Sequence, residues 1–145
     1  MNLRTIIAIS FLGVVTIGMT GCHGPGDLSD PKNREKVSRF AHNHLENRLE
    51  DLDATEAQLK ALEGVEKPVL DQAFQAYDGN KPAKEALIAE WNSAAPDATK
   101  VHTIIDERVD ALRKVLHVAG DAAIKIHATL TPEQRKEAAE QMDCH

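Results

Sequence analysis

The amino-acid sequence predicts an all-α protein, an elongated and hooked antiparallel hairpin of about four helices. The first observation behind this prediction is an apolar residue at every third or fourth position along residues 98–134, which is the spacing of one helix face. This apolar seam comprises Ile105, Val109, Leu112, Leu116, Ala119, Ala123, Ile126 and Leu130. The second observation is a pair of helix-start signals, at residues 52–58 and 130–134, that mark corners between helices. We therefore expect the seam to lie along other helices.

The first 21 residues are predicted to be a lipoprotein signal peptide. Arg4 gives a positive start, residues 6–17 are almost wholly apolar, and Met-Thr-Gly-Cys at residues 19–22 resembles a bacterial lipobox. By that resemblance, cleavage precedes Cys22 and this cysteine carries the lipid. The alternative is an uncleaved membrane helix, for which the apolar run is short.

Residues 22–33 are expected to form a flexible tether, because they are rich in Gly, Pro, Ser and Asp. Residues 34–145 then form one small helical domain. The chain has 17 basic and 23 acidic residues, a net charge of −6. An acidic chain without a basic patch argues against nucleic acid and anionic lipid surfaces as partners, whereas metal cations or basic proteins suit it better.

The first helix of the domain is expected over residues 33–52. Within it, His42 and Glu46 stand four residues apart on one face, so they can hold one cation or form a surface ion pair. His44 lies about 200° around the helix from His42, so the two imidazoles cannot chelate one ion in regular geometry. This helix therefore offers two separate candidate ligand groups.

The two corners share a Thr-x-x-Gln pattern. Thr55 is followed by Gln58, and Thr131 by Gln134, so that each threonine can cap a helix while its glutamine reaches back to the cap N–H. Pro132 strengthens the second start. The pattern predicts two reciprocal capping boxes.

Between the corners, the chain contains two predicted irregularities. Helix two is expected from Leu59 to Tyr77, with a kink at residues 64–68 rather than an end, and a stronger interruption follows at residues 78–82. A helix over residues 84–94 and a turn at residues 95–97 lead into the central helix, and a short polar helix follows over residues 132–142.

Further candidate ligands lie on the central helix and in the tail. His102 with Asp106, and His117 with Asp121, again stand four residues apart, as half of a metal site or as ion pairs. His117 flanks the apolar seam and is expected to be partly buried. The C-terminal residues with soft or nitrogen ligands are Met142, Cys144 and His145. Cys144 has no intramolecular partner once Cys22 is lipidated, which leaves an intermolecular disulfide, a metal ligand or a thiol without a role.

Leu130, Thr131 and Gln134 fit a Leu-Thr-x-x-Gln motif, and Thr55 with Gln58 repeats it with Ala54 in place of the leucine. The chain thereby resembles the Spy and CpxP family of periplasmic proteins, including its heavy-metal sensor and resistance branch of the CnrX and ZraP type. The resemblance covers about residues 34–142. It implies a hooked four-helix hairpin, a homodimer and no catalysis.

Two functions follow from this resemblance. The first is the sensing or buffering of Zn, Ni, Co or Cu ions by a lipid-anchored protein that faces the periplasm. Its candidate ligands are His42, His44, Glu46, His117, His127, Cys144 and His145. The sensor's own histidine pair falls on His44 and Phe40, so its site is not transferred intact. The alternative is an ATP-independent chaperone or stress-regulator module, whose partners are unfolded clients or a membrane regulator.

An enzyme is not expected, because the sequence has no nucleophile motif, no Gly-rich phosphate loop and no dense Cys/His framework. A tethered helical spacer without binding activity is the third possibility. His23 follows Cys22 where some lipoproteins retained at the inner membrane have aspartate, which favours the outer membrane for the anchor.

Overall fold

The computed structural model describes residues 27–143, which form helices and turns without a β-strand. The prediction of an all-α protein is therefore confirmed for these residues. The helices are α2 (Pro31–Asp51), α3 (Glu56–Leu62), α4 (Lys67–Asp78), α5 (Asn80–Trp91), α6 (Ala98–Thr129) and α7 (Pro132–Asp143). Among the helices described, none is both long enough and apolar enough to cross a membrane.

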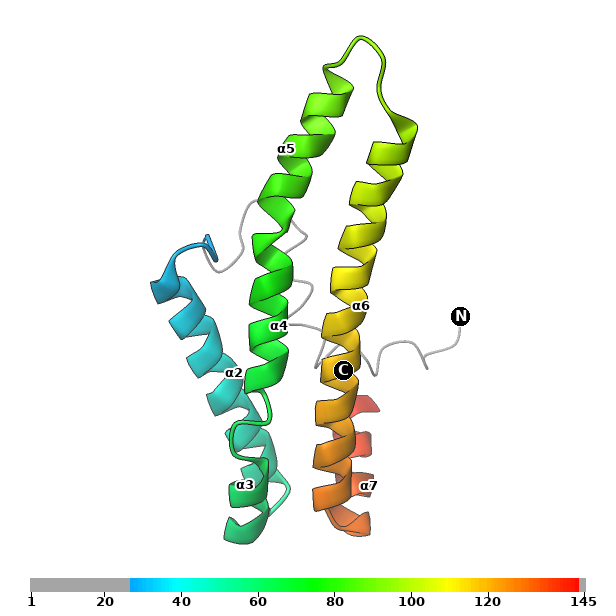
Figure 1. Cartoon of the computed structure of the whole chain (residues 1–145). Helices are drawn as coiled ribbons and strands as arrows, with labels where there is room; N and C mark the ends of the chain where they lie inside the picture. The colour runs from blue at the N-terminus through cyan, green and yellow to red at the C-terminus, as the bar shows by residue number, and fades with distance from the viewer. Residues whose placement is uncertain (1–26, 144–145) are drawn as a thin grey trace.

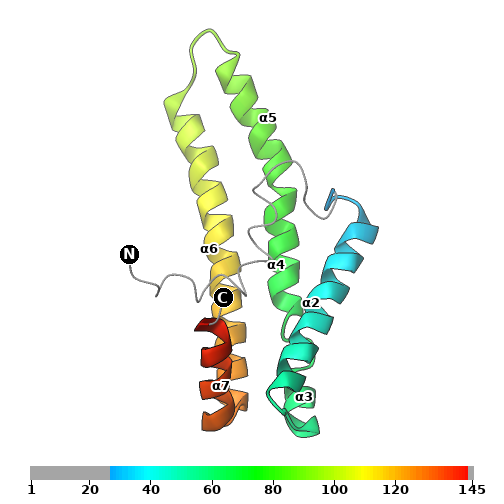
Figure 2. The same cartoon turned by 180° about the vertical axis from the view of Figure 1, so that it is seen from behind.

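The long helix α6 lies beside a column made by α4 and α5, which follow each other almost in line (Figure 1). α6 contacts α3, α4 and α5, and α2 packs against α4. The view from behind shows α7 in front of the lower part of α6 (Figure 2). The lower half of the molecule is therefore several helices thick, whereas the upper half consists of α5 and the first half of α6. We call the lower extremity the corner end and the α5–α6 turn the tip.

The structure differs from the prediction at both irregularities: the main break lies at residues 63–66, and only one residue separates the helices near residue 79. Residues 64–68 were expected to be a kink, but α3 ends at Leu62 and α4 begins at Lys67, so the helix is interrupted there. Gly64 has a φ of 68°, a left-handed conformation that breaks the helix. Pro68 lies in the first turn of α4, where its missing N–H costs no helical hydrogen bond. The predicted kink was therefore wrong.

The interruption predicted at residues 78–82 is instead a single residue between two helices. Gly79 keeps a right-handed backbone, with φ −73° and ψ −11°, and Pro82 lies in the first turn of α5. A Cβ on Gly79 would clash with Nη1 of Arg108, whose guanidinium donates a hydrogen bond to the Ala76 carbonyl. The glycine thus gives room for an arginine that joins α6 to the end of α4.

Two glycines give a matched test of backbone conformation. A Cβ on Gly64 or on Gly120 would meet no atom within 4 Å, so packing contributes nothing to either substitution. We expect Gly64→Ala to lower the free energy of unfolding by about 1 kcal/mol, because alanine is strained at positive φ. Gly120→Ala, inside α6, should raise it by about 1 kcal/mol through helix propensity. Urea denaturation followed by circular dichroism measures both, and a stabilising Gly64→Ala would contradict the assigned conformation.

The buried face of α6 differs from the predicted apolar seam. The buried residues of this helix are Ile104, Val115 and Ala122. Of the predicted seam, Leu130 is buried, and Leu112, Ala119 and Ile126 are half-buried. The exposed seam residues are Ile105, Val109, Leu116 and Ala123. The seam prediction was therefore wrong for half of its residues, because half-buried Arg108 lies on the side that faces α4 and so turns Val109 outward.

The hydrophobic core lies at the corner end. Its buried residues are Leu49, Leu52, Leu62, Val65, Val69, Ala122 and Leu130. They come from α2, α3, α4, α6 and the turns beside them. This cluster therefore joins the helices before α6 to the C-terminal end of α6. Leu62, at 1% exposure, is one of the two most completely buried side chains.

Candidate functional site

The two Thr-x-x-Gln corners have the same internal hydrogen bonds. Thr55 Oγ1 accepts a hydrogen bond from the Gln58 N–H (3.3 Å), and the Thr55 N–H donates to Gln58 Oε1 (2.9 Å). Likewise, Thr131 Oγ1 accepts from the Gln134 N–H (3.2 Å), and the Thr131 N–H donates to Gln134 Oε1 (2.9 Å). Both predicted capping boxes are therefore confirmed.

The glutamines also fasten the corners to each other. Gln58 Nε2 donates to the Thr129 carbonyl (2.9 Å), and Gln134 Nε2 donates to the Leu52 carbonyl (3.0 Å). Gln58 Nε2 also lies 2.8 Å from Gln134 Oε1, so the two amides bond directly. Each glutamine uses its oxygen for its own cap and its NH₂ group for the other corner, which a glutamate could not do. The repeated glutamine was the only sequence signal for this contact between corners.

The first corner has two more residues than the second between its leucine and its threonine. Leu52 and Leu130 are both buried at 6% exposure, although Leu52 is separated from Thr55 by Asp53 and Ala54. Asp53 makes the extra turn with a φ of 51°, a conformation that aspartate tolerates better than most residues. Leu52 therefore supplies the apolar anchor that the sequence lacks at Ala54.

His42 lies between two carboxylates. Its Nε2 atom is 3.3 Å from Glu46 Oε1, on the next turn of α2, and its Nδ1 atom is 3.1 Å from Glu66 Oε1, just before α4. The Glu66 side chain is only 15% exposed, and its buried Oε2 atom has no hydrogen-bond partner among the described residues. The sequence predicted the pair of His42 with Glu46 but not Glu66, which comes from the turn before α4.

This arrangement is compatible with two kinds of chemistry. A nitrogen and an oxygen that bind one tetrahedral metal at about 2.0–2.1 Å lie about 3.3 Å apart, as His42 Nε2 and Glu46 Oε1 do. A carboxylate on the other ring nitrogen, the position of Glu66, fixes the orientation of a metal-ligating histidine. A protonated imidazole that donates one hydrogen bond to each carboxylate would have the same geometry.

The other candidate ligands do not join this pair. His44 is exposed and stacks on Phe40, with ring centroids 6.0 Å apart. His117 is exposed, contrary to the expected partial burial, because it follows Leu116 on the outward side of α6. His127 is also exposed and lies 3.4 Å from the Arg135 guanidinium, a cation that disfavours a bound metal ion.

Three of the predicted functional residues lie outside the described residues: Cys22, Cys144 and His145. Within residues 27–143, no group of three or more His, Cys, Asp or Glu side chains is placed to hold a metal ion. Among the described residues, His42 and Glu46 could therefore supply two ligands at most, and a metal site there would need a third from elsewhere.

The buried carboxylate of Glu90 connects α5 to the start of α6 at the tip. Glu90, at the end of α5, is paired with the Lys100 ammonium and accepts a hydrogen bond from the Asp97 N–H (3.0 Å). The Asp97 side chain caps α6 by accepting from the N–H groups of Thr99 (2.8 Å) and Lys100 (3.3 Å). The pKa of Glu90 is held below its ordinary 4.5, mainly by the hydrogen bond from Lys100 and to a smaller extent by the hydrogen bond from the Asp97 N–H. The same contact raises the pKa of Lys100 above its ordinary 10.5.

These pKa shifts predict a pH window for the stability of the tip. Since the pKa of Glu90 is lowered on folding, its contribution is complete above pH 4.5 and disappears as the pH falls through the lower folded value. The raised pKa of Lys100 preserves the ion pair up to pH 10.5 and beyond. Urea midpoints of wild type and Glu90→Gln should therefore differ at pH 7 and converge below pH 4.5. Glu85→Gln, at an exposed position of α5, is the control and should show no such convergence.

The exposed part of the predicted seam forms one line on α6. We call Ile105, Val109 and Leu116 the α6 stripe. At about 100° per residue, the three positions fall within about 40° of one another around the helix axis. Ile105 is 47% and Leu116 38% exposed, so each side chain presents roughly half of its apolar surface. A partner could therefore cover a continuous apolar line.

The chain matches no protein-family model, and neither curated proteins nor solved structures give a match. We therefore describe the structural class of the protein from its own helices and corners. It is an all-α protein with two interlocked Thr-x-x-Gln corners at one end and an exposed apolar line along its longest helix.

Proposed function

We propose that the chain is a non-enzymatic, ATP-independent chaperone or stress-regulator module, of the Spy and CpxP type, that binds apolar segments of unfolded proteins. The observation that carries this proposal is the α6 stripe. Single exposed apolar side chains are ordinary on protein surfaces, but three on one helix face form a continuous contact line. The hooked hairpin and the homodimer that the resemblance implies belong to the same proposal.

The expected binding is weak and reversible. Complete burial of an Ile, Val or Leu side chain contributes about 1.5–3 kcal/mol, and these three are already half covered. A client could therefore gain about 3 kcal/mol from the α6 stripe before the entropic cost of association. Such binding would delay aggregation without trapping the client.

The test is suppression of aggregation of reduced α-lactalbumin by the domain at equal stoichiometry. We expect the wild type to suppress light scattering and the double variant Ile105→Ser with Val109→Ser to lose this effect. The matched control is Ile124→Ser, which removes a 68% exposed side chain from another face of α6. The proposal fails if the wild type does not suppress aggregation, or if the control loses as much activity as the double variant.

Sedimentation equilibrium tests the predicted homodimer on the same proteins. A stable dimer that only the stripe variant dissociates would show that a second copy occupies the α6 stripe. That result would count against client binding at this line. A dimer unaffected by the double variant would leave the α6 stripe free for clients.

A second function, the sensing or buffering of heavy-metal ions, is favoured by the geometry of His42. In this proposal, Nε2 of His42 and Oε1 of Glu46 bind Zn, Ni, Co or Cu, and Glu66 orients the imidazole. A third ligand would come from a second copy or from the C-terminal cysteine and histidine. The partly buried, negatively charged Glu66 next to the site would favour a cation.

Isothermal titration calorimetry with each metal tests the second function. We expect His42→Ala to abolish binding and Glu66→Gln to weaken it about 10–100-fold. His102→Ala is the matched control, because His102 also has an aspartate four residues later but lies exposed on α6. Wild-type affinity no tighter than millimolar would end the metal proposal and leave the chaperone proposal intact.

Both functions are proposed for a lipoprotein that faces the periplasm, anchored through Cys22 in the outer membrane by preference. The support is the lipobox-like sequence at residues 19–22. Mass spectrometry of the protein purified from membranes tests the anchor. Acylation should be present in the wild type and absent in Cys22→Ser.

A further inference from the structure

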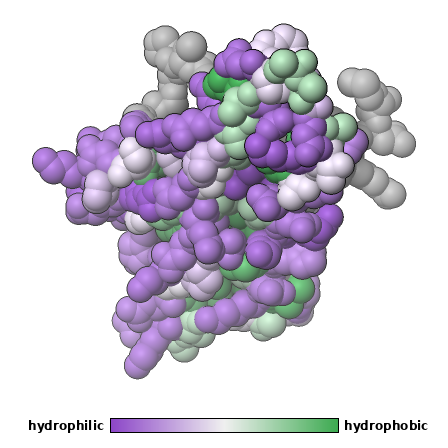
Figure 3. Space-filling view, turned by 45° about the horizontal axis from the view of Figure 1, so that its top comes forward, coloured by the Kyte–Doolittle hydropathy of each residue, from purple (hydrophilic) through white to green (hydrophobic). Residues whose placement is uncertain are grey.

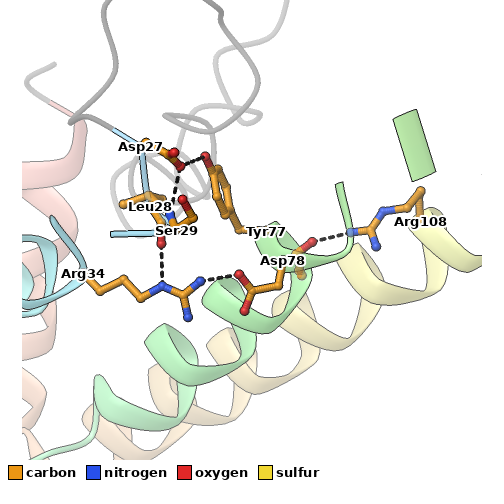
Figure 4. Close-up of polar contacts among 8 residues, drawn as sticks. Asp27, Leu28, Ser29, Arg34, Tyr77, Asp78 and Arg108 are labelled. Atoms are coloured by element: carbon orange, nitrogen blue, oxygen red, sulfur yellow. Dashed lines mark hydrogen bonds and ion pairs between the residues drawn. The ribbon is translucent and has the colours of Figure 1, made fainter. Parts of the chain in front are cut away.

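The first described residues are fastened to the end of α4, at Tyr77 and Asp78 (Figure 4). We call these contacts the tether clasp. Its residues are Asp27, Ser29, Arg34, Tyr77 and Asp78. The Tyr77 hydroxyl donates to Asp27 Oδ1 (3.2 Å), the Ser29 N–H donates to the same oxygen (2.9 Å), and Arg34 pairs with Asp78. The clasp therefore fixes the point at which the N-terminal segment meets the domain.

The clasp limits how far the domain can be from a lipid on Cys22. Cys22 precedes Asp27 by five residues, which can span at most about 17 Å. From the clasp, the tip is one α5 length away, 12 residues or about 18 Å. The corner end is one α2 length away, 21 residues or about 31 Å. With residues 22–27 extended along α5, a bilayer that holds Cys22 can therefore come close to the level of the tip patch, but it cannot reach the corner end.

The tip carries exposed apolar side chains. We call Leu87, Ile88 and Trp91 the tip patch. Trp91 is 85% exposed at the last residue of α5, and Ile88 stands one turn before it. Seen with the top of the molecule brought forward, apolar residues reach the surface among hydrophilic ones (Figure 3). Tryptophan is enriched at membrane–water interfaces, where its ring is partly in lipid and its N–H in contact with water.

The acidic groups of the α5–α6 turn, Glu90 and Asp97, are engaged within the protein, whereas Lys84 and Glu85, one turn before the tip patch, are exposed. Glu90 is paired with Lys100 and bonded to the Asp97 N–H, and the Asp97 carboxylate caps α6. Residues 92–96 of the turn carry no charge. At the turn itself, the carboxylates of Glu90 and Asp97 are therefore already bonded within the protein and need not be stripped of water unpaired when the tip approaches a bilayer. Since the chain as a whole is acidic, the contact is apolar and does not depend on anionic lipid.

We propose that the tip patch inserts into the interface of the bilayer that holds the lipid anchor. The domain then has two membrane contacts, the acylated Cys22 and the side chain of Trp91, and the corner end points away from the membrane. This inference rests on the proposed lipid anchor, but it does not depend on chaperone or metal-binding activity. A second copy or a client at the tip patch is the competing occupant.

The sole tryptophan makes the test direct. The full-length lipidated protein is reconstituted in phosphatidylcholine vesicles with or without bromine on the acyl chains, and its fluorescence is compared. We expect brominated lipid to quench Trp91 about twofold or more, because an interfacial indole lies next to the upper acyl chain. The double variant Leu87→Ser with Ile88→Ser should reduce the quenching. The control Ile124→Ser, an exposed apolar residue far along α6, should not.

Each outcome decides the inference. If mass spectrometry shows acylated Cys22 but bromine does not quench Trp91, the insertion is wrong and the anchor stands. If Cys22 is not acylated, the anchor and the insertion fail together. A blue shift of Trp91 emission that appears without vesicles and grows with protein concentration would assign the tip patch to a second copy and overturn the proposal. Failure to suppress aggregation would affect only the chaperone proposal.

Discussion

Leu62→Ala should lower the free energy of unfolding by about 3 kcal/mol, because it removes a fully buried leucine from the core at the corner end. Leu62 is 1% exposed and belongs to a cluster with residues from α2, α4 and α6. The loss combines the transfer free energy of the deleted methyl groups with the cavity that they leave. Urea denaturation at pH 7, followed by circular dichroism at 222 nm, measures the change.

Ile124→Ala is the matched control for this prediction. Ile124 is 68% exposed, so its truncation removes little buried surface and should change the free energy of unfolding by about 0.5 kcal/mol or less. Equal losses for Leu62→Ala and Ile124→Ala would contradict the assignment of the core to the corner end.

Gln134→Ala should lower the free energy of unfolding by about 2 kcal/mol, although the side chain is only half-buried. The truncation removes the cap on the Thr131 N–H and the hydrogen bond to the Leu52 carbonyl, and it takes from the Gln58 amide one of its two acceptors, the other being the Thr129 carbonyl. Gln75→Ala, on an exposed face of α4, is the control and should cost a few tenths of a kcal/mol.

A double-mutant cycle with Gln58→Ala separates the contact between the corners from the two caps. If each glutamine only capped its own helix, the losses of the two single variants would add. Because the two amides bond directly, we expect the double variant to lose about 1 kcal/mol less than the sum. Strict additivity would mean that the corners are independent in solution.

The features that the sequence predicted well are those set by neighbouring residues. Helices α2, α6 and α7 and both capping boxes depend on spacings of three or four positions, so Thr55 with Gln58 and Thr131 with Gln134 could be predicted directly. The contact between the corners could not, because Gln58 and Gln134 are 76 positions apart. Neither motif indicates which carbonyl accepts a hydrogen bond from the NH₂ group of its glutamine.

The errors have physical causes in tertiary structure. Apolar spacing placed Ile105 and Val109 inside, but it could not show that Arg108 faces α4 and reaches the Ala76 carbonyl past Gly79. The same spacing gave His117 a partial burial that the structure does not show, since α6 turns this residue outward. An apolar pattern thus located the helix but not its rotation.

The candidate metal ligands were predicted in part for the same reason. His42 and Glu46 share one helix face at a spacing of four, which the sequence shows. Glu66 reaches His42 from the turn before α4, 24 positions away, and no local pattern connects them. The position of His44, stacked on Phe40, follows from the half-turn that separates it from His42.

The one-ended core gives the molecule an uneven resistance to local opening. Amide hydrogens around Leu62 should exchange with solvent only on global unfolding, whereas those of α5, which is backed by a single neighbouring helix, should exchange earlier by fraying. A ligand or surface that binds α5 would slow amide hydrogen exchange in α5 and leave the exchange rate around Leu62 unchanged. The corner end is therefore the rigid part of the molecule, whereas α5 can deform locally. α5 can adapt to a bound molecule while the core at the corner end stays folded.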